Sequence, residues 1–342
     1  AATAALRNRS DAKIILSAKN SALRKEPVPP VAIQINETDD PILGKCVYIQ
    51  NSLLRIVVSI SYGPRILSLG FTGEENIFWY DSGLTRKTAA AEMAEAYGPG
   101  ACFYEYGGHR LWAAPPRMPE TYYPDNDPVT YTIRPEGVLF TPPPQRRNGL
   151  QPSLELVLSP EAPNLMVIHS AENLGKEKSH LALWPITMLR PGGTVVLPQN
   201  NEETDGNLPD RVLTLWPGSN ICDPRLTLGN RYILIRHAAM PGEHPLILGT
   251  NNTSGWLAYA LEGTVLVKRY VHNPNISYPN HNCSCRVYAG DSFVQLESIS
   301  PMYGLEPGQA IRHVENFTLY HSDALPQNPK ESAIQSFIDN LR

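Results

Sequence analysis

The stretch at residues 104–116 reads YEYGGHRLWAAPP and places polar and aromatic side chains next to each other. Its two glycines allow the backbone to turn tightly. His109 and Arg110 offer hydrogen-bond donors, and Trp112 offers a large aromatic surface. Together they could form a polar cleft with an aromatic floor. The alternative is a turn in which the tryptophan fills the core and the arginine faces solvent.

Three more charged residues stand where a strand could carry them into a site. Arg65 follows the turn Tyr-Gly-Pro and opens an apolar strand, either as an exposed edge residue or as a guanidinium directed into a cleft. In TVLVKRY, Lys268 adjoins Arg269, so period-two alternation turns one of them inward. In FVQLES, Glu297 shares a face with Phe293, and that face is either buried or wet.

Several common catalytic motifs are missing from the chain. It has no GxxxxGK[ST], no GxSxG, no HExxH and no CxxC. Nucleotide-dependent and serine-hydrolase chemistry therefore lack their usual evidence. The segment HNCSC offers too few ligands for a metal site, so we expect no metal and no cofactor.

Composition and charge narrow the possible partners. The 342 residues are 42% hydrophobic and carry a net charge of −4, which argues against nucleic acid as a partner. No apolar run approaches the ~20 residues that span a bilayer, so we expect no membrane span. Five cysteines do not indicate a full disulfide framework. The start AATAALRNRS lacks an initiator Met, and we favour a periplasmic or secreted location over a cytoplasmic one.

Short β-branched or alternating runs dominate from residue 45 onward and predict an all-β fold. Some fifteen such runs, with little helical periodicity between them, favour a sandwich or barrel. We expect a poorly ordered lead-in over 1–30 and a single β domain over 31–325. Two helices are predicted: one over 85–97, and one within 326–342 that docks on the domain through a face listed as Ile334, Phe337, Ile338 and Leu341.

The order of several motifs resembles the galactose-mutarotase-like superfamily. These motifs are YGPRILSLGF, YGGHRLWAAPP, ALWPITML, LVKRY and the long segment from YPNHNCSCRVYAG to HVENFTLY. The resemblance runs from about residue 45 to 321 and is greatest to bacterial families of the DUF4380 type. It implies the large antiparallel β-supersandwich of aldose 1-epimerases, in agreement with the strand count.

The resemblance also implies site residues. Glu297 occupies a place similar to that of the glutamate that takes the proton from the anomeric hydroxyl. His109 resembles the sugar-site histidine, and Arg65 and Trp184 fall where sugar contacts are expected. Trp184-Pro185 stands where these enzymes usually carry the His-Pro that protonates the ring oxygen. The identity of the general acid therefore stays open.

Opening a sugar ring needs one group that accepts a proton and one that donates a proton. Among His109, His169 and His180, the first has the most favourable context because Arg110 and Trp112 adjoin it, and His169 is expected to be a packed strand residue. With the resemblance in view, Arg110 offers donors to sugar hydroxyls or a carboxylate, and Trp112 can stack on a sugar ring.

Two functions follow from these expectations. The first is an aldose epimerase or mutarotase-like enzyme that acts at the anomeric carbon of a mono- or oligosaccharide. Its catalytic residues would be Glu297 and His109, and Arg65, Arg110, Trp112, Trp184 and Lys268 would contact the substrate. The second is a non-catalytic carbohydrate-binding protein or an accessory domain of polysaccharide degradation, which the Trp184-Pro185 departure favours.

Overall fold

A computed structural model describes residues 33–201, 206, 208–323, 325–326 and 328–341. The predicted lead-in over 1–30 lies outside the described residues. The described residues belong to one compact unit. Among the described residues, no helix is long and apolar enough to cross a membrane.

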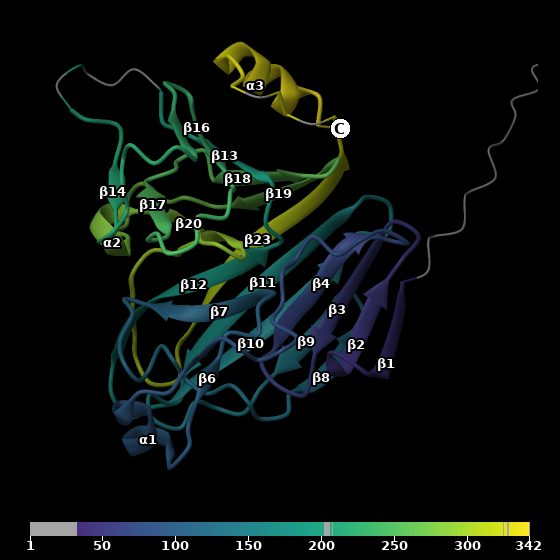
Figure 1. The fold of residues 1–342 in the computed structure, drawn as a ribbon. Helices are drawn as coiled ribbons and strands as arrows, with labels where there is room; N and C mark the ends of the chain where they lie inside the picture. The colour runs from purple at the N-terminus through teal and green to yellow at the C-terminus, as the bar shows by residue number, and fades with distance from the viewer. Residues whose placement is uncertain (1–32, 202–205, 207, 324, 327, 342) are drawn as a thin grey trace, which may run out of the picture. The chain divides into compact units, whose positions relative to one another are not determined.

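Antiparallel strands build two large sheets (Figure 1). The first sheet has the order β1 (Gln34–Asp40), β2 (Gly44–Gln50), β3 (Leu54–Ser59), β4 (Arg65–Phe71), β7 (His109–Ala114), β12 (Ser179–Leu189), β21 (Val294–Ser298), β20 (Cys285–Ala289), β17 (Leu246–Thr250) and β14 (Leu213–Leu215), and β22 (Tyr303–Leu305) also pairs with β12. The second sheet has the order β15 (Leu226–Leu228), β16 (Tyr232–Arg236), β13 (Thr194–Pro198), β18 (Trp256–Leu261), β19 (Thr264–Tyr270), β23 (Ala310–His321), β11 (Asn164–Asn173), β10 (Leu150–Leu158), β9 (Gly137–Thr141) and β8 (Thr130–Arg134).

The main hydrophobic core lies between these sheets. Alternate residues of the strands face it, as Leu154, Leu156 and Leu158 do along β10 and Leu165 and Val167 along β11. Each of these side chains is at most 3% exposed. Burial of apolar side chains from both sheets stabilises the sandwich. The predicted all-β supersandwich is confirmed.

The described residues include three helices, and the one predicted over 85–97 is shorter than expected. Helix α1 spans Ala91–Tyr97 because Lys87–Thr88 (β5) pairs with Phe103–Tyr104 (β6) in a small two-stranded sheet. The short α2 spans Pro279–Asn282. Helix α3 (Glu331–Asp339) packs on the outer face of the second sheet, where its buried Ile334 joins a cluster with Val196 and Leu234.

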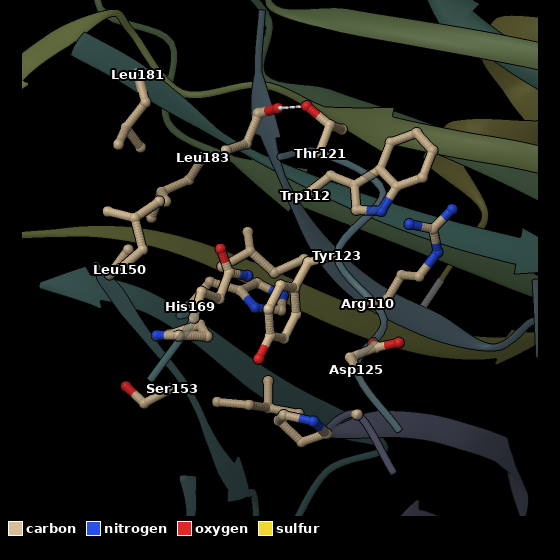
Figure 2. Close-up of a pocket in the computed structure, with 18 of the residues that line it drawn as sticks. Arg110, Trp112, Thr121, Tyr123, Asp125, Leu150, Ser153, His169, Leu181 and Leu183 are labelled. Carbon is tan, nitrogen blue, oxygen red and sulfur yellow. Dashed lines mark hydrogen bonds between the residues drawn. The ribbon is translucent and has the colours of Figure 1, made fainter. Parts of the chain in front are cut away.

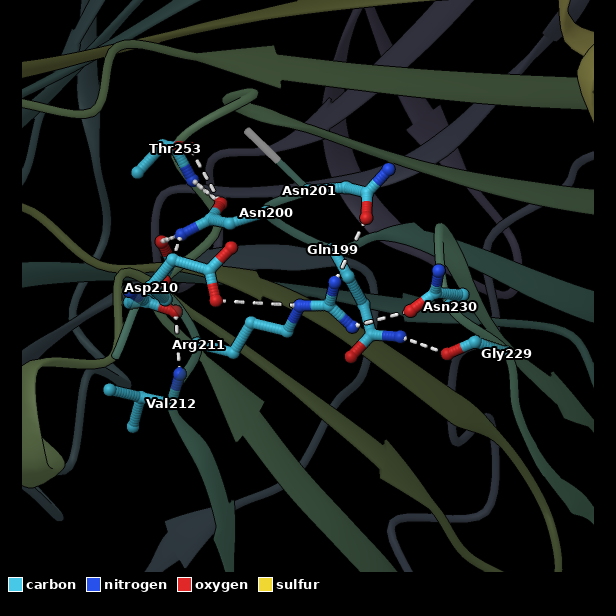
Figure 3. Close-up of polar contacts among 10 residues, drawn as sticks. Gln199, Asn200, Asn201, Asp210, Arg211, Val212, Gly229, Asn230 and Thr253 are labelled. Carbon is cyan, nitrogen blue, oxygen red and sulfur yellow. Dashed lines mark hydrogen bonds and ion pairs between the residues drawn. The ribbon is translucent and has the colours of Figure 1, made fainter. Parts of the chain in front are cut away.

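Polar contacts hold Asn200, Asn201 and Arg211, which lie between β13 and β14. Arg211 donates hydrogen bonds to Asn201 Oδ1 at 2.9 Å and to Asn230 Oδ1 at 3.1 Å. Asn200 Oδ1 accepts from the backbone and the hydroxyl of Thr253 (Figure 3). These contacts join three loops through side-chain amides and an exposed arginine, and we assign them a structural role.

The first sheet has a weak seam between β4 and β7. The two strands pair only at Ile66 and His109. Pro64, directly before β4, has no N–H to donate, so the ladder cannot continue toward Leu111. Instead, the Gly63 N–H donates to the Asp125 carbonyl at 2.8 Å. A pocket opens beside this seam.

Gly108 sets the course of the chain into β7. Its φ is +68°, and a Cβ there would lie 2.2 Å from the Ile66 carbonyl oxygen. The backbone cannot move aside easily, because the Gly108 N–H donates to Trp79 and its carbonyl accepts from Met188.

We therefore expect Gly108→Ala to lower the free energy of unfolding by at least about 3 kcal/mol, since it adds a backbone clash to an unfavourable φ. Gly308→Ala is the matched control, because Gly308 has φ +82° and nothing within 4 Å of a new Cβ. That control should cost only about 1 kcal/mol. Urea denaturation measures both, and equal losses would show that the close approach to Ile66 is unimportant.

Candidate functional site

Strand β7 places its two polar residues on opposite faces of the first sheet. His109 pairs with Thr187 on β12, and Arg110 pairs with Ile186. Cross-strand partners share a face, and successive residues alternate. His109 faces the second sheet, where its ring meets His169 and Phe317. Arg110 therefore faces away from the second sheet, on what we call the outer face.

Glu297 also lies on the outer face, because it pairs with the same Ile186 from the other side. Arg286, its neighbour on β20, holds both carboxylate oxygens at 2.7 and 2.8 Å. The indole of Trp184 donates a further hydrogen bond to Glu297. Glu297 is fully buried and Arg286 is 12% exposed, so the protein's own donors occupy this carboxylate.

A pocket that is partly open to solvent lies beside the β4–β7 seam. Residues from both faces of the first sheet and from the second sheet line it; they include Pro64, Phe103, Arg110, Trp112, Tyr123, Asp125, Leu154, His169 and Leu183. Figure 2 shows Arg110 beside Trp112 on one side of this pocket and His169 on the other.

Arg65 holds Asp125, one of the residues that line the pocket. It is fully buried, and its Nη2 donates to both oxygens of Asp125 at 2.9 Å. Its guanidinium carbon lies 5.6 Å from the centre of the Phe103 ring and 5.1 Å from that of Tyr106. Asp125 lines the pocket and Arg65 does not, so Arg65 acts on the pocket through its partner.

Arg110 has a different environment. It is 2% exposed, and its Nε and Nη1 have no hydrogen-bond partner. The guanidinium carbon lies 3.9 Å from the centre of the Trp112 ring and 4.9 Å from that of Phe103. Burial, followed by repulsion from Arg65, lowers the pKa of Arg110 to about 9. The side chain is thus a cation at neutral pH that aromatic rings hold in place.

A buried polar cluster bridges the two sheets on the inner side. Its members are His109, His169, Thr187, Lys268, Ser298, His313 and Glu315. At its centre, Lys268 Nζ lies 2.7 Å from Glu315 Oε1 and donates to Thr187 Oγ1 at 3.1 Å. Ser298 donates to the same Glu315 oxygen at 2.6 Å.

Burial and charge set the protonation states of this cluster. Burial lowers the pKa of His109 well below its usual value, that of His169 to about 3 and that of His313 to about 4. Burial alone would raise the pKa of Glu315, but the Lys268 ammonium and the nearby histidines hold it at about 2. At neutral pH the cluster therefore contains one ion pair and three neutral imidazoles.

The hydrogen bonds indicate which ring nitrogens carry protons. Glu315 Oε2 lies 3.3 Å from His109 Nε2, and this carboxylate favours the form in which Nε2 carries the proton and Nδ1 accepts from the Thr187 hydroxyl at 2.9 Å, while Thr187 accepts from Lys268. His109 then carries its proton on Nε2 and donates to His169 Nε2 at 2.7 Å. This leaves the proton of His169 on Nδ1, which has no partner in the described structure. His169 lines the pocket, and its buried Nδ1–H has no acceptor among the described residues.

Three members of the cluster could coordinate a metal ion. Ligand atoms of His109, His169 and Glu315 lie within 4.8 Å of one another. The Lys268 ammonium already balances the Glu315 charge, so a divalent cation would meet a positive neighbour.

The structure brings only part of the predicted site together. Arg110 and Trp112 line the pocket, whereas Glu297 and Trp184 share the outer face without lining it. His109 and Lys268 lie on the inner side, so His109 and Glu297 do not face each other across one space. This placement gives no support to a direct acid–base pair of these two residues.

Sequence reasoning missed Glu315, Asp125 and Arg286. The first had a usable signal, because AIRHVENFTLY alternates and places His313 and Glu315 on the face of Phe317. Asp125 lies in a loop and Arg286 on a short strand, where no pattern marks their partners.

Solved structures share this fold at low sequence identity. A TPR-domain containing protein from Parabacteroides distasonis has a TM-score of 0.53 and 14% identity, over 92% of this chain and 58% of its own length. A galactose mutarotase-like protein from Lactobacillus casei has a TM-score of 0.50 and 12% identity, over 80% of this chain and 100% of its own. One from Clostridium acetobutylicum also has 0.50 and 12%, over 85% and 99%.

No family model matches the chain, and no curated protein matches its sequence. The present chain spans little more than half the length of the TPR-domain containing protein. At these identities the similarity shows the fold alone, which is the β-sandwich of galactose mutarotase-like proteins.

The buried histidines predict how stability depends on pH. The folded-state pKa of His169 and His313 lies below the unfolded value of 6.5, so the unfolded chain binds protons first as the pH falls. The stabilisation that each of these histidines contributes is complete above pH ~6.5, and it is lost as the pH falls toward the folded-state pKa. Lowering the pH from 7.5 to 5 should therefore lower the free energy of unfolding by about 2 kcal/mol for each of the two histidines.

Urea denaturation at pH 7.5 and 5 tests this in wild type and in His169→Gln. The variant should lose about 2 kcal/mol less than wild type over this interval, because Gln does not titrate. Equal losses would mean that His169 is protonated in the folded state.

Proposed function

We propose that this protein binds a carbohydrate in the pocket beside the β4–β7 seam. The composition of that pocket is the main support for this proposal. Trp112, Phe103 and Tyr123 provide aromatic surface, and Arg110 and His169 provide N–H donors. Sugar sites combine these features, because rings stack on aromatic faces and hydroxyls need fixed polar partners. The galactose mutarotase-like fold supports the proposal as an analogy, and the finer likeness to DUF4380-type families stays a prediction.

The test is calorimetry with a panel of mono- and oligosaccharides. Trp112→Ala should weaken sugar binding about tenfold or more, because it removes the main stacking surface. Trp256→Ala is the matched control, since Trp256 packs near α3 on the outer side of the second sheet. Both variants should first show the wild-type far-UV circular dichroism spectrum. A panel in which no sugar binds the wild type would contradict the proposal.

A second candidate is mutarotase-like catalysis with Glu297 as the base. One observation favours it: Glu297, Arg110 and Trp184 share the outer face, and Glu297 and Arg110 flank the same residue of β12. For this role, the carboxylate must first leave Arg286, since both of its oxygens are held in the described state. The candidate acids are then limited to groups that reach the same space, and His109 lies on the inner side of the first sheet.

Anomer-resolved NMR on any sugar that binds tests this candidate. Glu297→Gln should slow anomeric exchange by about 10²-fold if Glu297 is the base, while affinity changes little. The melting temperature must be compared as well, because the substitution leaves Arg286 without its partner charge. If the wild type accelerates no anomerisation of a sugar that it binds, the catalytic candidate is rejected and the binding function stands.

A further inference from the structure

Arg110 is a buried cation whose donors are left free. Its side chain is 2% exposed, two of its three nitrogens have no hydrogen-bond partner, and it lines the pocket. The rings of Trp112 and Phe103 attract the guanidinium through their faces. They do not offer the paired oxygen acceptors that a guanidinium fork binds best. A buried guanidinium in this state is costly unless a further partner reaches it.

The protein does not supply that partner, because each carboxylate around the pocket is already paired. Four such groups either line the pocket or act on Arg110 electrostatically. The pairs are Asp125 with Arg65 at 2.9 Å, Glu120 with Arg147 at 2.9 Å, Glu105 with Arg86 at 2.7 Å and Glu297 with Arg286 at 2.7 Å. Each pair is neutral in sum. The charge of Arg110 is therefore one positive charge in this region that no protein carboxylate compensates.

The pocket presents a second free donor at its inner end. The hydrogen-bond order from Lys268 through Thr187 and His109 leaves a proton on His169 Nδ1. A ligand in the pocket thus meets a cationic donor at Arg110 and a neutral donor at His169. Leu154 and Leu183 line the pocket as well and contribute apolar surface to its wall.

We propose that the ligand of this pocket is a sugar acid whose carboxylate binds Arg110. The proposal rests on the carbohydrate-binding function above and names its substrate class. A carboxylate carries one negative charge, which matches the one unpaired arginine, and its two oxygens fit the guanidinium fork. A phosphate monoester carries about −1.5 to −2 at neutral pH and would leave negative charge uncompensated in the pocket.

Calorimetry with matched sugars tests the proposal on the wild-type protein. The panel pairs each hexuronate with its neutral hexose, its methyl ester and its 6-phosphate, and includes short oligosaccharides of each kind. The hexuronate should bind at least about tenfold more tightly than the neutral hexose or the ester, the effect of a charged hydrogen bond. It should also bind more tightly than the 6-phosphate.

Variants then locate the effect. Arg110→Gln should bring the ratio of the affinities for the acid and for its methyl ester to about one, whatever it does to the affinity for the neutral sugar, because the acid and the ester differ in the charge that Arg110 binds. Arg110→Lys keeps the charge without the fork and should retain part of the preference. Arg134→Gln, which changes the net charge equally, is the control, because Arg134 is an exposed residue on β8 that pairs with Glu155. It should keep the full preference.

The possible results separate this inference from the function on which it rests. If neutral sugars bind as tightly as their uronates, the acid proposal is wrong and carbohydrate binding stands. A stronger affinity for the 6-phosphate, or a preference that survives Arg110→Gln, also overturns it. If no sugar of either charge binds the wild type, the proposed function itself fails.

Discussion

The alternation of side chains along one strand controls the chemistry of this molecule. Strand β7 carries His109 and Arg110 in succession, and a β-strand must turn such neighbours to opposite faces. The His109 side chain therefore points into the interior between the sheets, and the Arg110 side chain lies on the outer face. The two residues look like one motif in the sequence, but they belong to two different environments. A site that used both would need access to both sides of a sheet.

Such access exists at one place, where β4 and β7 stop pairing. Pro64 ends the ladder after a single bridge, so the sheet has a local gap in its hydrogen bonding. The pocket lies at this gap, and its lining includes Arg110 from the outer face and His169 from the second sheet. An irregularity in backbone pairing thus connects the outer face to the buried polar cluster. The cluster is relevant to the pocket through His169, which belongs to both.

Much of the fold follows from the sequence, because period-two patterns report directly on strand faces. Alternation in TVLVKRY required one cation to face inward, and Lys268 does so. The helix over 85–97 was overestimated, since local propensity does not report the pairing of Lys87–Thr88 with Phe103–Tyr104 on the other side of the helix. The site was only partly predictable for a similar reason. The partners Asp125 and Arg286 come from separate segments, and no local pattern reveals a tertiary ion pair.

The contrast between two buried ionic environments explains why the pocket, rather than the cluster, is the better candidate for ligand binding. Lys268 has three acceptors, namely Glu315, Thr187 and the Leu296 carbonyl, so its donors are fully used. The ion pair joins neighbouring strands of the second sheet, and the Lys268 bonds to Thr187 and Leu296 reach the first sheet, so this ammonium has no donor left for a ligand. Arg110 is equally buried, but its charge and two of its nitrogens have no protein partner. Both cations are buried, and the one without a protein partner is where an external anion gains most from binding.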